Sequence, residues 1–158
     1  MIARTVIIAV ATILLCASLI HAAALPYKVV VEKEGPDEEA FAKITAALTE
    51  AKVNAALIDG AFKSFDRYID RRVDKERKSV TLYPQTIFEI TKNAAAQSWQ
   101  ASEIGDLLIY AQKEIDEENS SGTRLKRIAV AEIAKGKKLH DVIDALEKSE
   151  GADDDDKH

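Results

Sequence analysis

Apolar residues recur at three- and four-residue steps through most of the chain between residues 36 and 150. This spacing places apolar side chains on one face of an α-helix and polar residues on the other. The expected helices run from Pro36 to a break at Val53–Asn54, along a stripe from Ile58 to Val73, from Pro84 to near Trp99, from Ala101 to Glu117, from Thr123 to Gly136, and from Leu139 to Leu146.

Helical stretches joined by short connections predict an all-α fold, and we expect a compact bundle or an array of about five to six short amphipathic helices behind an N-terminal signal peptide. Alanines in the apolar stripes let neighbouring helices approach closely. Gly60 lies inside the second helix, where glycine costs about 1 kcal/mol relative to alanine, and it indicates a kink or a close contact. Trp99, the lone tryptophan, is expected in the core.

Two short runs rich in β-branched residues interrupt the helical pattern, at residues 27–31 and 79–82. Such runs are typical of strands, and these two could pair into a small ribbon. Because two short strands alone are only marginally stable, we interpret both as extended linker. Residues 25–35 are accordingly predicted to be an extended N-terminal segment, followed by a helical domain at residues 36–150.

The first 24 residues have the three parts of a secretory signal peptide. Arg4 supplies a short positive region, an uncharged apolar run follows from Thr5 to Ile20, and small residues stand at Ala22 and Ala24. An A-x-A end of this kind predicts cleavage before Leu25. We therefore expect export to a periplasm or to the extracellular space.

An uncleaved membrane anchor is the alternative interpretation of the same segment. Residues 5–25 match the length of about 20 residues that spans a bilayer, and only His21 interrupts their apolar character. Cleavage is favoured because no charged stop follows the A-x-A end. Lipid attachment at Cys16 is disfavoured because the bulky Leu15 precedes it.

Removal of residues 1–24 leaves 134 residues, enough for one domain of ordinary size. Cys16 is the only cysteine, and an exported domain without disulfides favours a bacterial envelope. Without Arg4 the chain has 21 basic and 27 acidic residues, and this acidic balance argues against nucleic acid as a partner. Residues 151–158 include four consecutive aspartates, Asp153–Asp156, whose repulsion predicts an acidic disordered tail, either natural or left by an expression tag.

Residues that usually carry catalysis are scarce. After residue 24 the chain has no cysteine and only two histidines, His140 and His158, and no G-x-S-x-G turn presents a serine. The sequence also lacks the usual zinc, haem and calcium motifs. We therefore predict a non-enzyme with no catalytic residue, no metal site and no cofactor, and we expect His140 near the surface of a short helix.

Acidic residues cluster at Glu114 and at residues 116–118, the end of the predicted fourth helix. A glycosidase needs two carboxylates that face each other across a cleft. A run of acids at a helix end is more typical of a solvated surface, so we expect these side chains to point outward. An acid–base enzyme that uses Glu114 and Glu117 is the alternative, and it requires the two to converge in a cleft.

Two stretches are rich in basic residues. Between residues 66 and 78, aspartates and basic residues form two rows with a four-residue repeat, which predicts a solvated, salt-bridged helix face. Between residues 124 and 138, six basic residues oppose only Glu132. Such an excess suits anionic lipid head groups, acidic envelope polymers or an acidic protein. The candidate binding residues are Arg124, Lys126, Arg127, Lys137 and Lys138.

These observations together predict a non-enzymatic, exported helical protein that binds or scaffolds a partner in the periplasm or cell envelope. The expected partner is a protein or an anionic envelope surface. Weak contact with a membrane surface is also expected. The alternative is a membrane-anchored helical structural protein that keeps its N-terminal helix.

Overall fold

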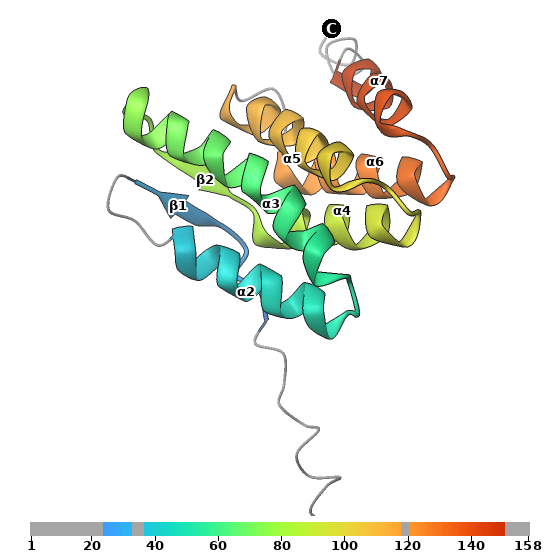
Figure 1. Ribbon diagram of the computed structural model, residues 1–158. Helices are drawn as coiled ribbons and strands as arrows, with labels where there is room; N and C mark the ends of the chain where they lie inside the picture. Colours follow the sequence, from blue (N-terminus) through green and yellow to red (C-terminus); the bar gives the residue numbers. More distant parts are fainter. Residues whose placement is uncertain (1–23, 33–36, 118–120, 151–158) are drawn as a thin grey trace, which may run out of the picture.

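Helices make up most of the chain in the structure, a computed structural model that describes residues 24–32, 37–117 and 121–150. Figure 1 follows the chain from the first strand to the last helix. In chain order the elements are β1 (Val29–Val31), α2 (Asp37–Glu50), α3 (Ala55–Asp70), the π-helical turn η1 (Arg71–Lys75), β2 (Val80–Leu82), α4 (Pro84–Ala96), α5 (Ala101–Asp116), α6 (Gly122–Ala134) and α7 (Leu139–Glu150). The prediction of a predominantly helical, all-α fold is confirmed.

The predicted signal peptide, apart from Ala24, and the predicted acidic tail lie outside the described residues. Ala24 itself is exposed, just ahead of the ribbon strand β1. Within the ranges that the structure describes, no helix is both long and apolar enough to cross a bilayer.

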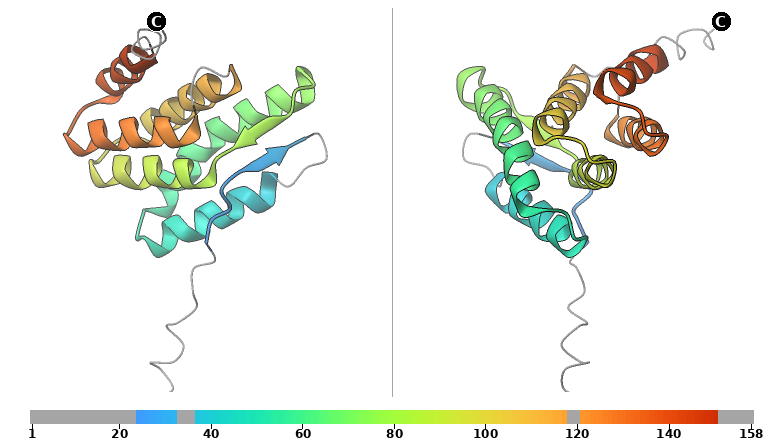
Figure 2. Two further views of the ribbon diagram at one scale, coloured as in Figure 1. Left: turned by 180° about the vertical axis from the view of Figure 1, so that it is seen from behind. Right: turned by 45° about the vertical axis from the view of Figure 1, so that its right-hand side comes forward.

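The α-helices of the described ranges form three consecutive hairpins, α2 with α3, α4 with α5, and α6 with α7. Helix α4 packs between α2 and α6, and helix α5 packs between α3 and α7. The right-hand view of Figure 2 shows the three pairs side by side, with α2 and α3 at one edge and α6 and α7 at the other. The fold is thus an array of helical hairpins stacked in chain order.

The two β-branched runs pair as an antiparallel ribbon, with Val30 opposite Thr81. The interpretation of both runs as linker is therefore wrong. Their buried face explains the difference, because Val31, Val80 and Leu82 are at most 1% exposed. Packing of this face on α2 and α5 stabilises a ribbon that would be marginal alone.

Local signals set several helix ends. The side chain of Asn54 accepts hydrogen bonds from two backbone N–H groups in the first turn of α3, at 2.9 and 3.3 Å. Ser121, not the predicted Thr123, caps α6, because its hydroxyl accepts from the backbone N–H of Arg124 at 3.2 Å. Gly136 follows α6 with a left-handed φ of 79°.

Small residues let α3 and α5 lie close together in the same direction. A Cβ atom at Gly60 would lie 2.8 Å from the Cβ of Ala101, so the predicted close contact at Gly60 is confirmed. A Cβ at Gly105 would lie 3.0 Å from the carbonyl oxygen of Ala61. Trp99 is buried, as predicted, at 2% exposure. This seam carries the ends of α3 and α5 to the same part of the molecule.

Candidate functional site

The backbone of α3 continues beyond Asp70 as the π-helical turn η1. The backbone N–H of Glu76 donates to the carbonyl of Arg71 at 3.3 Å, which is a five-residue step instead of the four of an α-helix. Single π-helical turns are frequent at functional sites. Here Arg71 stays exposed, while the next residue, Arg72, is half-buried against α5.

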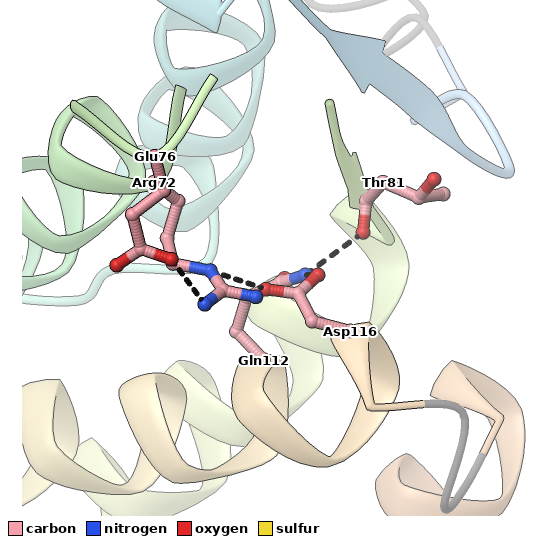
Figure 3. Close-up of polar contacts among 5 residues, drawn as sticks. All are labelled: Arg72, Glu76, Thr81, Gln112 and Asp116. Atoms are coloured by element: carbon pink, nitrogen blue, oxygen red, sulfur yellow. Dashed lines mark hydrogen bonds and ion pairs between the residues drawn. The ribbon is translucent and has the colours of Figure 1, made fainter. Parts of the chain in front are cut away.

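Arg72 is the centre of a polar network that joins η1, β2 and α5 (Figure 3). Its Nη1 donates to Glu76 Oε2 at 2.6 Å, and its Nε lies 3.5 Å from Asp116 Oδ2. The amide Nε2 of Gln112 donates to Asp116 Oδ1 at 2.9 Å and to the carbonyl of Thr81 at 3.1 Å. One set of contacts therefore holds the end of α5 against η1 and β2, which precede it in the chain by about thirty residues or more.

Burial dominates the electrostatics of this network. The Asp116 side chain is 7% exposed, and its burial raises the pKa of the carboxyl, against the opposing effects of the Gln112 hydrogen bond and the Arg72 charge. Burial, together with the nearby Asp116 charge, raises the pKa of Tyr68 to about 12. The Arg72 ion pair and the Gln112 hydrogen bond therefore offset only part of the effect of burying the Asp116 carboxyl, whose Oδ2 makes no hydrogen bond within the described ranges.

The sequence predicts that all acidic side chains at the end of α5 point outward. In the structure they do not all do so. Glu117 is exposed and Glu114 is half-buried, but Asp116 turns inward toward η1. The expectation is wrong for Asp116 because the end of α5 lies against another element, so one side of its last turn is covered. Glu118 lies outside the described residues.

A cleft of about 580 Å³ opens beside the network. Its lining includes the basic side chains of Arg72, Arg77 and Lys78, together with Ser79, and Tyr83 and Ile115 add apolar surface. Arg77 has a φ of 53°, in the left-handed region that non-glycine residues seldom adopt. Within the described ranges, neither Arg77 nor Lys78 has an acidic partner within 4 Å.

The structure has two other hollows of comparable size in its described part. One of about 520 Å³ lies across the same loop and shares Arg77, Lys78 and Ser79 with the cleft. A larger one of about 760 Å³ lies between α2 and α3 and has an apolar lining that includes Phe41 and Phe62. It lies away from the buried contacts of Arg72 and Asp116, so we take the cleft beside Arg72 as the candidate site.

The structure divides the predicted binding residues Arg124, Lys126, Arg127, Lys137 and Lys138 into two groups. The first three belong to the first two turns of α6, and the other two follow its last turn. A helix of 13 residues is about 20 Å long, so the groups lie at opposite ends of α6. Arg124 is half-buried, and its guanidinium donates to the carbonyl of Ser149 on α7.

The beginning of α6 lies next to the cleft. Gly122 packs directly on the ring of Tyr83, where a Cβ atom would overlap the ring. The hydroxyl of Thr86 donates to the carbonyl of Gly122 at 2.8 Å and fixes this contact. Because Tyr83 also lines the cleft, the first turns of α6 and the loop of Arg77 lie at the same end of the molecule.

The acidic residues and the histidine considered as catalytic candidates do not lie together in the cleft. Its lining includes Asp116 but neither Glu114 nor Glu117. His140 is exposed on α7 and lies 3.7 Å from Asp144, in agreement with the predicted surface position. Among the described residues, no group of three or more histidine, cysteine or acidic side chains is arranged to hold a metal ion.

The sequence pattern does not reveal Tyr68, Arg72, Gln112 and Asp116 as a unit. One signal was available, because Arg72 lies outside the two charged rows with a four-residue repeat and comes three residues after the core residue Ile69. That spacing places Arg72 beside the apolar stripe. The charged helix face that the sequence predicts is in part correct, since Arg67 and Arg71 are exposed.

Comparison with protein-family models, with curated proteins and with solved structures gave no match to this chain.

Proposed function

We propose that this protein is a non-enzymatic, exported helical module of the periplasm or cell envelope, which binds an anionic ligand or surface at the cleft beside η1. One observation carries the proposal: Arg77 and Lys78 line a cleft in which Asp116, the one carboxylate among the described lining residues, is engaged by Arg72 and Gln112.

The balance of charge supports binding of an anion. Arg72 is compensated by Glu76 and Asp116. Arg77 and Lys78 bring two positive charges with no acidic group within 4 Å in the described ranges, although the charge of Lys78 acts on Asp116 from farther away. A cleft lined by charge of one sign raises the local concentration of ligands of the opposite sign. The loop of Arg77 makes a left-handed turn and leads directly into the ribbon strand β2.

The first turns of α6 enlarge the cationic end. Arg127 is exposed and Lys126 is half-buried, so both add positive potential near the cleft. Arg124 adds its charge, but its guanidinium is bound to the end of α7. In this proposal Lys137 and Lys138 lie outside the site, although the sequence pattern groups them with the other three.

Charge reversal tests the proposal. We would measure co-sedimentation with vesicles of 30% phosphatidylglycerol in phosphatidylcholine, using pure phosphatidylcholine as the neutral reference. Each basic residue at an anionic surface contributes about 1 kcal/mol, so Arg77→Glu/Lys78→Glu should weaken binding by about thirtyfold or more. Lys137→Glu/Lys138→Glu changes the net charge equally and should have an effect of about twofold or less.

Two results would contradict the proposal. If the wild-type protein sediments equally with anionic and neutral vesicles, it has no anion-binding surface of this kind. If Lys137→Glu/Lys138→Glu loses as much binding as the cleft variant, net charge or the far end of α6 is responsible. The variant Lys126→Glu/Arg127→Glu, at the near end of α6, should lie between the other two.

Export has its own measurement, the intact mass of the native protein in soluble and membrane fractions. A soluble species that begins at Leu25 would agree with cleavage before that residue. A full-length species that stays in the membrane fraction at high salt would favour the membrane-anchored alternative.

A further inference from the structure

We infer that the ligand of the cleft carries a phosphate monoester joined to an apolar or aromatic group; this inference rests on the proposed function. The lining of the cleft combines cationic side chains with apolar surface from Tyr83 and Ile115, besides Ser79, Thr81 and Asp116. A ligand that satisfies both must have a charged head and an apolar body.

The cationic part matches the charge and donor pattern of a phosphate monoester. Arg77 and Lys78 provide two positive charges, which equal the charge of the ester dianion at neutral pH. Arginine binds phosphate oxygens through paired N–H groups, and lysine adds a compact positive charge. Ser79 adds a hydroxyl donor at the same edge.

Arg72 provides a further donor behind this pair. Its Nη1 bonds to Glu76 and its Nε faces Asp116, but within the described ranges Nη2 makes no hydrogen bond. Asp116 is the group that would repel an anion. Its charge is opposed by Arg72 and its Oδ1 accepts from Gln112, so the cationic edge of the cleft stays attractive.

The apolar part explains why a phosphate ion alone is too small. Tyr83 is held from one side by Gly122 and from another by Tyr27, whose ring lies 5.8 Å away in an edge-to-face arrangement. Ile115 also lines the cleft. A volume of about 580 Å³ falls in the range of small-molecule sites, and the space beyond the phosphate suits a ring packed on Tyr83.

The test uses three probes in isothermal titration calorimetry with residues 25–158. These are phenyl phosphate, inorganic phosphate and phenol. Phenyl phosphate should bind at one site at least about fivefold more tightly than inorganic phosphate, because only the ester meets both parts of the lining. Phenol should show no binding. Affinity for phenyl phosphate should fall below about pH 6, where the dianion gains a proton.

Variants locate the two parts of the site. Arg77→Gln/Lys78→Gln should weaken phenyl phosphate by about tenfold or more, with circular dichroism confirming that the variant is folded. Ile115→Ser should reduce the preference for phenyl phosphate over inorganic phosphate and leave inorganic phosphate unchanged. Lys137→Gln/Lys138→Gln should match the wild type. Vesicles that contain phosphatidic acid distinguish a lipid head group from a free ester as the source of the phosphate monoester. If the vesicles compete with phenyl phosphate for the protein, the ligand is a lipid head group. If they do not compete, the ligand is a free ester with the same phosphate chemistry.

Failure of this inference is separable from failure of the proposed function. Equal affinity for phenyl phosphate and inorganic phosphate would overturn the two-part ligand. No binding of phenyl phosphate at millimolar concentration, with vesicle binding that still depends on Arg77 and Lys78, would overturn the inference and leave the proposed function standing. Loss of both kinds of binding would overturn both.

Discussion

Replacement of Gly105 by alanine tests the seam that aligns α3 with α5. The new Cβ would lie 3.0 Å from the carbonyl oxygen of Ala61 and would overlap the hydroxyl of Ser64. The Ser64 hydroxyl can rotate away, but it then loses its hydrogen bond to the Ala61 carbonyl, now 3.1 Å long. The backbone oxygen cannot rotate, so the helices must separate by a few tenths of an ångström.

The expected loss of stability follows from two destabilising contributions and one stabilising contribution. Overpacking of a close contact costs about 1–3 kcal/mol, and loss of the Ser64 hydrogen bond adds about 1 kcal/mol. Alanine in a helix is favoured over glycine by about 1 kcal/mol, which offsets part of this. The free energy of unfolding should therefore fall by about 1–3 kcal/mol, or several degrees in Tm.

Urea unfolding measures this change, followed by far-ultraviolet circular dichroism and by the fluorescence of Trp99, the lone tryptophan. Ser64→Ala should recover part of the loss in the Gly105→Ala background, because it removes the overlapping hydroxyl. Gly136→Ala is the control. Nothing lies within 4 Å of its added Cβ, so the left-handed φ of 79° alone opposes the substitution. Its effect on stability should therefore be the same with serine or alanine at position 64. A Gly105→Ala protein as stable as the wild type would refute the close α3–α5 contact.

Two further predictions concern the pH response and the ribbon. Because burial raises the folded-state pKa of Asp116 above its ordinary 3.8, its stabilising contribution is complete below that value and is lost as pH rises through the higher folded pKa. The urea midpoint of Asp116→Asn should thus fall less than that of the wild type between about pH 4 and 7, and parallel curves would contradict the burial of the carboxyl. Leu82→Ala should cost about 2–5 kcal/mol in urea unfolding, since Leu82 is fully buried. Val30→Ala, at a residue 46% exposed, should cost about 0.5 kcal/mol or less, and similar losses in the two variants would show that the ribbon does not belong to the core.

Local signals were enough to predict most of the helical fold. The apolar stripes, Pro84 at the start of α4 and the glycine after α6 act within a few residues of chain, so the sequence shows them directly. The β1–β2 pairing is different, because it depends on contact between residues about fifty apart and on helices that cover one face. Marginal strands become stable only through such tertiary packing.

The candidate site was largely hidden from the sequence for a related reason. Arg71 and Arg72 are identical neighbours, and apart from the spacing of Arg72 from Ile69 the sequence does not show which one the turn η1 directs toward α5. Charge counted along the chain also overstated the patch on α6. Arg124 is bound to Ser149, and Lys135 lies 2.5 Å from Glu132, so part of the apparent excess serves contacts within the fold.

The ribbon also imposes an order on folding. Strand β1 is made first, but its partner β2 follows only after residues 32–79, and closing so long a loop is slow compared with forming helices. If the chain crosses a membrane N-terminus first, the three valines of β1 emerge as an unpaired strand edge, which is prone to association with other chains. Until residue 82 has emerged, the backbone groups of β1 on this edge have no partner strand within the chain.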